Sequence, residues 1–327
     1  MKHFCTRTGL AYGLLGAALL VPAGVAGAQS YPVRPVRLLV PFPAGGGSDL
    51  IARVTAQKLS AALGQSMVVD NRAGASGNIA FELAAKAPPD GYTLLFANSS
   101  IAIGPAVYQK LPFDPVKDLT PISMVSSYPF VLVVHPSLPA QNVSELVALA
   151  KARPGSLSYS SAGAGTMSHF AMELLTLRTG IKTTHLPYKG AAPATVGLLS
   201  NEAQLAFVVL PVAQTQINAG KLRGLGVAAK ARSPVIPQVP TMQEAGVAGN
   251  EALQWNGFFA PAGTPQPILD RLHGEIVKAL TAADVRQRFE AEGAEPVGST
   301  PREFAAFFRT ETAKWAEVAK RSGTKLD

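Results

Sequence analysis

Short runs of aliphatic and β-branched residues alternate with longer amphipathic segments along most of this chain. Residues 36–40 are almost all aliphatic, and residues 48–63 repeat leucine, isoleucine and valine at helical spacing. Because strands that alternate with helices favour parallel sheets, we predict an α/β fold built from βαβ units. The predicted strands are residues 36–40, 67–69, 93–97, 122–125, 130–134, 157–160, 183–186, 203–209 and 222–227, and the first predicted helices are residues 48–63 and 77–87.

Capping residues mark the starts of three further predicted helices. Asn142 stands three residues before an acid, Thr264 stands before a proline, and Thr300 begins a capping box with proline at the first helical position. The last two sites predict a helical tail over residues 265–292 and 301–321 that packs on a sheet. Aromatic residues at helical spacing usually pack inward, so we expect core positions and not a ligand cage for Phe304, Phe307, Phe308 and Trp315.

The first 28 residues have the pattern of a secretory signal peptide. Lys2 and Arg7 precede an apolar stretch over residues 10–21. Small residues at 26–28 predict cleavage before Gln29. The apolar stretch is short for a membrane span, which disfavours a permanent anchor. The only cysteine, Cys5, precedes that stretch, so we expect no lipid anchor. We therefore predict an exported protein of the periplasm.

The composition of the remaining chain excludes several functions. It has no cysteine, which excludes disulfides, thiol catalysis and cysteine-based zinc sites. The whole chain carries 29 lysines and arginines against 21 acids, a balance that suits an anionic ligand. No basic run with interleaved aromatic residues indicates a nucleic-acid partner. No apolar run after the signal approaches the length of a membrane span, so we expect a soluble mature protein.

Glycine-rich segments join predicted strands to predicted helices at four places. Small residues there let a ligand approach the backbone, and the following helix directs unpaired N–H groups and a partial positive charge toward it. For any one segment, a tight turn without a ligand explains the glycines equally well. The four together favour a carboxylate cradle built mostly from main chain. They are residues 41–49, 71–77, 160–166 and 188–192.

Signatures of catalysis are missing. Gly45 and Gly47 could begin a dinucleotide fingerprint, but its third glycine would fall at Leu50. Neither a phosphate-binding loop nor a nucleophile elbow occurs, and the histidines lack metal-ligand spacing. We therefore predict no catalytic residue, metal or cofactor. Two interpretations stay open for His169, which either lines a cleft or packs, and for Asp49, which is either a base or a partner of backbone N–H groups.

The ordered motifs of the chain resemble those of the tripartite tricarboxylate transporter substrate-binding proteins, the Bug receptor family. The resemblance covers nearly the whole mature length, and eight motifs in order make it specific. They are Tyr31-Pro32 with residues 36–40, residues 41–49, Asn71-Arg72 with Gly74-Ala75 and Gly77, residues 90–94, Gly163-x-Gly165-Thr166 with His169, residues 187–190, residues 219–223 and residues 260–265.

The resemblance implies a type II periplasmic binding protein fold with two α/β lobes around a ligand cleft. Residues 30–130 and 256–327 would form lobe 1, and residues 131–255 would form lobe 2. In the family the first glycine loop holds a carboxylate through backbone groups and ordered water, the loop at Gly165 and Thr166 is expected to donate to a carboxylate, and a third loop follows. The implied ligand-binding residues are Phe42, Ala44, Gly45, Gly46, Asp49, Ser99, Gly165, Thr166, His169, Tyr188, Lys189 and Gly190.

The resemblance also implies a function as a receptor that captures a small organic acid and delivers it to permease subunits of a tripartite transporter, with a monomer as the expected state. Family members often have an acid after the strand near residues 203–209, whereas this chain has none there. A buried ammonium would lack a partner, so we expect a ligand without an amine. Alternatives are a receptor that reports to a signalling protein and, less favoured, an enzyme on the same fold. A ligand-responsive regulator is disfavoured by the export signal and the missing DNA-binding helix pair.

Overall fold

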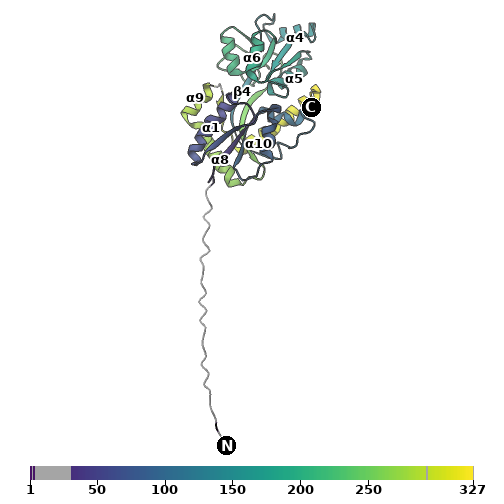
Figure 1. Ribbon diagram of the computed structural model, residues 1–327. Helices are drawn as coiled ribbons and strands as arrows, with labels where there is room; N and C mark the ends of the chain where they lie inside the picture. Colours follow the sequence, from purple (N-terminus) through teal and green to yellow (C-terminus); the bar gives the residue numbers. More distant parts are fainter. Residues whose placement is uncertain (2, 4–30, 292–293, 327) are drawn as a thin grey trace. The chain divides into compact units, whose positions relative to one another are not determined.

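The computed structural model describes residues 1, 3, 31–291 and 294–326, and the predicted signal peptide therefore lies almost wholly outside the described residues. Residues Tyr31–Asp327 form one compact unit (Figure 1). Its strands follow the order β2-β1-β3-β9-β4-β7-β5-β6, with β10 and β8 also paired to β4. The α/β prediction is confirmed, and helices separate most of the parallel strands.

The first half of the sheet contains the N-terminal βαβ units. Strand β1 pairs in parallel with β2 and β3, while β3 pairs antiparallel with β9. Helix α1 packs against α8 and α9, and its apolar face contacts the buried strand residues of this half. The elements are β1 Val36–Val40, α1 Gly47–Leu63, β2 Met67–Asn71, η1 Ala75–Gly77, α2 Asn78–Ala85, β3 Thr93–Asn98, η2 Ser99–Ala102, α3 Gly104–Val107, β9 Leu253–Pro261, α8 Gln266–Thr281, α9 Ala283–Ala291 and β10 Glu295–Pro296.

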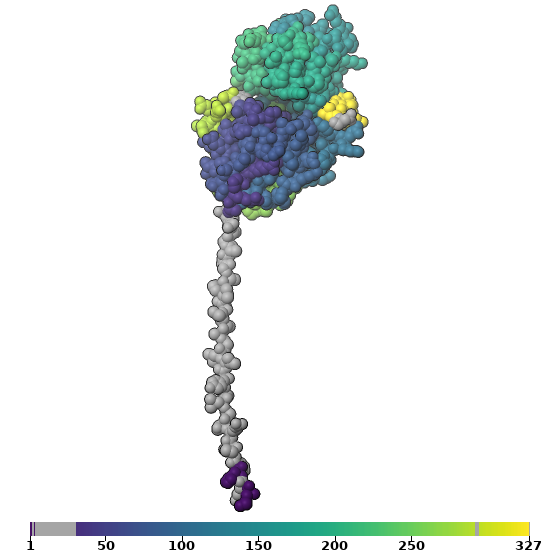
Figure 2. Space-filling view, viewed as in Figure 1, coloured from purple at the N-terminus to yellow at the C-terminus, as the bar shows by residue number. Residues whose placement is uncertain are grey.

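The second half repeats this arrangement. Strand β5 pairs in parallel with β6 and β7, and β7 pairs antiparallel with β4. In the space-filling view, the teal and green residues of this half gather together, apart from the purple and blue residues of the first half (Figure 2). The elements are β4 Leu119–Val134, α4 Val143–Ala152, β5 Ser158–Ser161, α5 Met167–Thr179, β6 Thr184–Pro187, α6 Ala191–Leu199, β7 Leu205–Val209, α7 Leu210–Asn218 and β8 Arg223–Val227.

Strand β4 connects the two halves. It pairs with β9 from Leu119 to Pro129 and with β7 from Phe130 onward. The two strands predicted at residues 122–125 and 130–134 are therefore one strand, and β9 was not predicted. The predicted lobe boundary near residue 130 lies where β4 changes partners, and the predicted boundary near residue 256 lies within β9; both boundaries stay predictions.

Helix α10, Pro301–Ser322, packs in the core as predicted. Phe304, Phe308 and Trp315 are almost fully buried, and Phe307 is partly buried against the same cluster. The Trp315 indole donates to Glu311 at 2.9 Å, and its ring meets Phe170 of α5 edge to face. Helix α10 therefore contacts strand β4 and also α5 of the second half.

Two of the three predicted helix caps are confirmed. The Asn142 side chain accepts from the N–H of Glu145, and Thr300 and Glu303 form a capping box. The prediction at Thr264 is wrong, because its hydroxyl donates to the carbonyl of Pro261 at 2.7 Å and closes the preceding turn instead. None of the helices that the structure describes combines the length and the apolar character needed to cross a membrane.

Candidate ligand-binding site

The four glycine loops all join a strand to a helical segment, as predicted, and they contact one another in sequence order. The Asn71 amide of the second loop donates to the Phe42 carbonyl of the first at 2.9 Å. Ser76 of the second loop donates to the Ala164 carbonyl of the third at 2.8 Å. The N–H of Gly190 in the fourth loop donates to the Ala162 carbonyl of the third at 3.0 Å. The loops therefore form one continuous rim across both halves of the sheet.

Helices α1, α5 and α6 begin on this rim without a side-chain cap. Their N-cap residues are Gly46, Thr166 and Gly190, and none makes a side-chain capping hydrogen bond. Of the helices that start outside the four loops, α4 and α10 are capped by Asn142 and Thr300, whereas α7 and α8 also lack a side-chain cap. The first N–H groups of a helix have no partner within it, so the uncapped starts leave donors and a positive dipole end for an anion.

Asp49 holds the first loop together. Its carboxylate is almost fully buried, accepts from the Gly45 N–H and Arg53 through Oδ2, and accepts from the Asn71 amide through Oδ1. Burial alone would raise the pKa of Asp49, but the hydrogen bonds from Arg53 and Asn71 outweigh it and keep that pKa low. The geometry supports the interpretation of Asp49 as a partner of backbone N–H groups. Ala44, Gly45 and Gly46 are exposed, and Phe42 is half-buried.

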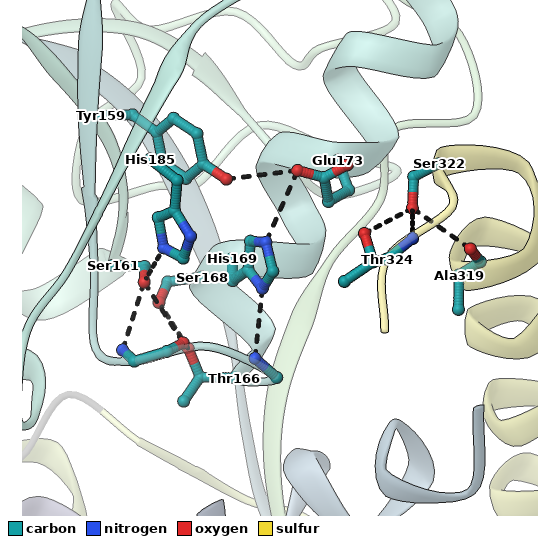
Figure 3. A network of polar contacts seen from close by, with 12 residues as sticks. Tyr159, Ser161, Thr166, Ser168, His169, Glu173, His185, Ala319, Ser322 and Thr324 are labelled. Carbon is teal, nitrogen blue, oxygen red and sulfur yellow. Dashed lines mark hydrogen bonds and ion pairs between the residues drawn. The ribbon is translucent and has the colours of Figure 1, made fainter. Parts of the chain in front are cut away.

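The third loop is held by a set of short hydrogen bonds from α5 (Figure 3). Gly165 donates to Nδ1 of His169 at 3.1 Å. Ala162 donates to the Ser168 hydroxyl at 3.0 Å. The Thr166 hydroxyl donates to the Gly163 carbonyl at 2.7 Å. The Gly165 N–H and the Thr166 hydroxyl, which we expected to donate to a carboxylate, are thus engaged within the loop. Their role as ligand donors stays a prediction.

A stack of aromatic rings lies behind this loop. The His169 and His185 rings are nearly parallel with centroids 4.2 Å apart, and Tyr159 lies on His185 at 4.7 Å (Figure 3). His169 Nε2 lies 3.5 Å from Glu173, which also accepts from the Tyr159 hydroxyl. His185 Nε2 lies 2.6 Å from the Ser161 hydroxyl.

The surroundings of this stack shift two pKa values. Burial, and next the charge of His169, lower the pKa of His185 to about 4. Burial would raise the pKa of Glu173, but the hydrogen bond from His169 leads the effects that bring it below its usual range. At neutral pH the structure therefore favours a neutral His185 beside an ionised Glu173.

In the fourth loop, Tyr188 packs against a helix and Lys189 is exposed. The Tyr188 hydroxyl lies against Gly197 of α6, so close that a Cβ at that glycine would overlap it. Burial, and then the nearby Glu202, raise the pKa of Tyr188. Lys189 is exposed and immediately precedes Gly190, the N-cap of α6. Among the side chains of this loop, Lys189 therefore offers an exposed cation, whereas the phenol of Tyr188 packs on a helix.

Sequence reasoning missed a row of polar side chains on β9 and its neighbours. Asn256 is fully buried, accepts from the Ser48 hydroxyl of α1 at 2.9 Å and donates to Ser126 of β4 at 3.0 Å. Gln254 accepts from the predicted site residue Ser99, which is fully buried, at 3.2 Å. Two amides spaced by two residues within an apolar strand were the available signal, but β9 itself had not been assigned as a strand.

Other parts of the described chain offer less for a ligand. No group of three or more potential metal-ligating side chains gathers within the described residues. A surface hollow of about 320 Å³ lies at α7 and β8, remote in sequence from the glycine loops. Its one charged side chain, Arg223, donates to the carbonyls of Leu138 and Ala140.

The chain matches a known receptor family and a named member of that family. The model of the tripartite tricarboxylate transporter family receptor matches residues 51–324. Protein BugT of Bordetella pertussis is 40% identical over 312 residues, which cover 94% of this chain and 96% of BugT.

Two of the similar solved structures contain adipate and malate. Rpa4515 of R. palustris with adipate is 37% identical, with a TM-score of 0.81 over 90% of this chain and 100% of that one. MatC of Rhodopseudomonas palustris with bound malate is 32% identical, with a TM-score of 0.79 over 88% of this chain and 99% of that one. With its type II periplasmic binding protein fold, this chain belongs to the tripartite tricarboxylate transporter receptor family.

Proposed function

We propose that this protein is a periplasmic solute-binding receptor that captures a small organic carboxylate for a tripartite uptake system. The single observation that carries the proposal is the rim of contiguous loops on which α1, α5 and α6 begin uncapped. Helix starts of this kind bind anions because their N–H groups and dipoles point at the ligand. The adipate and malate bound by two relatives support a carboxylate as that anion.

The surroundings of the rim favour an acid that carries no amine. Both Asp49 oxygens accept hydrogen bonds from the protein, and Glu173 is paired with His169 behind the third loop. Strand β7, Leu205–Val209, consists of apolar residues. An ammonium group desolvated at this rim would lack a free carboxylate partner among these residues, which makes its burial costly.

Lys189 of the fourth loop is an exposed cation that suits the far end of a dicarboxylate. It is exposed beside the N-cap of α6, and its flexible side chain needs no fixed geometry to approach an anionic group. The predicted contacts of the first and third loops would then hold the other end. We propose Lys189 as a selector for dicarboxylates over monocarboxylates.

We propose binding without catalysis. The polar side chains nearest the loops, Asp49 and His169, are engaged with backbone N–H groups and with Arg53 and Glu173, each one helical turn away. Export by the N-terminal signal, delivery to permease subunits and a monomeric state complete the proposal. The family to which the chain belongs supports the first two of these.

A thermal-shift screen of the exported protein, expressed from the full-length chain, tests the proposal. The panel holds mono-, di- and tricarboxylates, aromatic acids and amino acids. An acid at about 100 times its dissociation constant stabilises the folded state by about 2.7 kcal/mol, so its class should stand out. A panel in which no acid gives a shift, with no acid released from the denatured protein by mass spectrometry, would contradict the proposal.

A further inference from the structure

The first turns of α1 and α5 are built alike, although they lie in different halves of the sheet. Gly45 and Gly165 both adopt left-handed backbone, with φ of +86° and +76°. The N-caps that follow them, Gly46 and Thr166, are extended, with φ and ψ of −78° and 160° and of −85° and 163°. Each start therefore has a left-handed glycine, an extended N-cap and no side-chain cap.

The third residue of each helix accepts a hydrogen bond from that glycine. The Gly45 N–H donates to Asp49 at 2.9 Å, and the Gly165 N–H donates to His169 at 3.1 Å. Both acceptors stand four residues after their glycine, and both are buried, at 1% and 5% exposure. The two contacts are the same device made with different side chains.

A partner one turn further along each helix completes the likeness. Arg53 donates to Asp49 at 2.9 Å, and Glu173 lies 3.5 Å from His169 Nε2. The two pairs have opposite polarity, since an acid accepts from an arginine in α1 whereas an imidazole faces an acid in α5. Glu173 favours the proton on Nε2 of His169, which leaves Nδ1 free to accept from Gly165.

These contacts occupy the polar atoms that the two side chains could offer to a solute. Asp49 accepts from Gly45, Arg53 and Asn71, and both His169 nitrogens face protein groups. The glycine N–H groups are occupied in the same way. The donors that stay open are those of the first helical residues, whose direction depends on how the preceding glycine and N-cap are held.

We propose that Asp49 and His169 are matching positioning residues that do not touch the captured acid. Each holds the left-handed glycine before its helix, and thereby fixes the direction of the open N–H groups in the first turn. The inference rests on the proposed capture of a carboxylate at these helix starts, and it reassigns two residues that the sequence suggested as ligand contacts.

Paired substitutions at His169 separate positioning from contact. In His169→Asn, the amide oxygen can take the position of Nδ1 and accept from the Gly165 N–H. In His169→Gln, the amide lies near the former position of Nε2, and the Gly165 N–H is left unpaired. Titration of the exported protein with adipate and malate should give affinities within about threefold of the original for His169→Asn and about tenfold weaker for His169→Gln. Direct contact through Nε2 would reverse this order, and a packing role would weaken both variants equally; either result overturns the proposal.

His135 supplies a matched control. Its Nδ1 also accepts a backbone N–H, from Ser137 at 3.2 Å, but it is only half-buried and lies outside the four loops. His135→Gln removes the same kind of hydrogen bond elsewhere in the protein. It should leave the affinity for adipate and malate unchanged, so an equal loss in this variant and in His169→Gln would overturn the assignment.

Amide hydrogen exchange decides the inference even if neither acid binds. In the ligand-free protein, the Gly165 N–H should be protected in the original chain and in His169→Asn, and should exchange at least about tenfold faster in His169→Gln. Asp49→Ala should release the Gly45 N–H in the same way. Equal exchange rates in all variants would overturn the positioning role. If the exchange rates differ as predicted but the unsubstituted protein binds neither acid, only the proposed function is contradicted.

Discussion

Glycine conformations define the rim at the scale of single residues. Gly45 needs a left-handed backbone, while its neighbour Gly46 is extended and has open space around its Cα. The glycines could be located from the sequence because they punctuate strand-to-helix joints. Which of them needs positive φ, and which only keeps space for a ligand, depends on the hydrogen bonds of the folded loop.

Substitutions of these two neighbours should therefore act differently. Gly45→Ala should lower the free energy of unfolding by about 1–2 kcal/mol, the cost of left-handed backbone for a residue with Cβ. Gly46→Val should stay close to the original stability, because the nearest atom to an added Cβ is the Pro43 carbonyl oxygen at 3.8 Å. It should nevertheless block capture of the acid. Urea unfolding and calorimetric titration measure the two effects, and retained binding by Gly46→Val would mean that this glycine only forms a turn.

His185 should make stability depend on pH. Its pKa is lowered from 6.5 to about 4 in the folded protein, first by burial and then by the charge of His169, while Glu173 acts in the opposite direction. Between these values the unfolded chain binds more protons, so stability is complete above about pH 6.5 and falls as the pH drops toward 4. His185→Gln should flatten this part of the curve in urea unfolding at several pH values. An unchanged slope would show that His185 is not the group responsible.

Side-chain directions at the rim could not be derived from the sequence. The family resemblance implies a ligand contact at Tyr188, and that contact stays a prediction; its hydroxyl lies against Gly197 because that glycine leaves room on α6. Gly165 and Thr166 both carry groups that can donate to an anion. In the structure the Gly165 N–H and the Thr166 hydroxyl donate to His169 and Gly163 instead. In each case the direction of the polar group depends on a partner elsewhere in the chain. For Tyr188 this partner is Gly197 on α6.

At the scale of elements, local patterns predicted βα alternation better than they predicted the strands that connect the lobes. Ser126 to Pro129 interrupts the aliphatic pattern, so β4 was divided into two strands. Pairing with β9 holds that segment extended, from Ser126 opposite Asn256 to Pro129 opposite Leu253. Such pairing joins residues more than a hundred positions apart and leaves no periodic signal in either segment.

Helix α10 should be a strong contributor to stability because it packs against elements of both halves. Trp315 is fully buried between Phe170 of α5 and its own helix, with its indole bonded to Glu311. Trp315→Ala should cost about 3–5 kcal/mol of unfolding free energy, the usual penalty for emptying such a site. Phe307→Ala, on the same helix but only partly buried, provides the control and should cost less. Equal losses in urea unfolding would contradict the central packing role of Trp315.

At the scale of the whole molecule, the family and the two-lobed fold could be predicted because eight ordered motifs carry them. The chemical class of ligand follows less directly, since main-chain N–H groups recognise a carboxylate without reading the rest of the molecule. The exclusion of an amine rests instead on charged side chains that are already paired, Asp49 with Arg53 and Glu173 with His169. The predicted lobe boundary near residue 130 lies where β4 changes partners from β9 to β7, and such a change is a property of the assembled sheet.

Calorimetric titration with matched acids tests the central claim most directly. Malate and aspartate differ by a hydroxyl against an ammonium on the same carbon, and adipate and 2-aminoadipate differ by the added ammonium. We predict that an amine-free acid binds at least about tenfold more tightly than its amino counterpart, a difference of about 1.4 kcal/mol. Tighter binding of aspartate than malate, or of 2-aminoadipate than adipate, would contradict the account. The rim would then have to supply a free carboxylate, whereas its carboxylates are already paired within the protein.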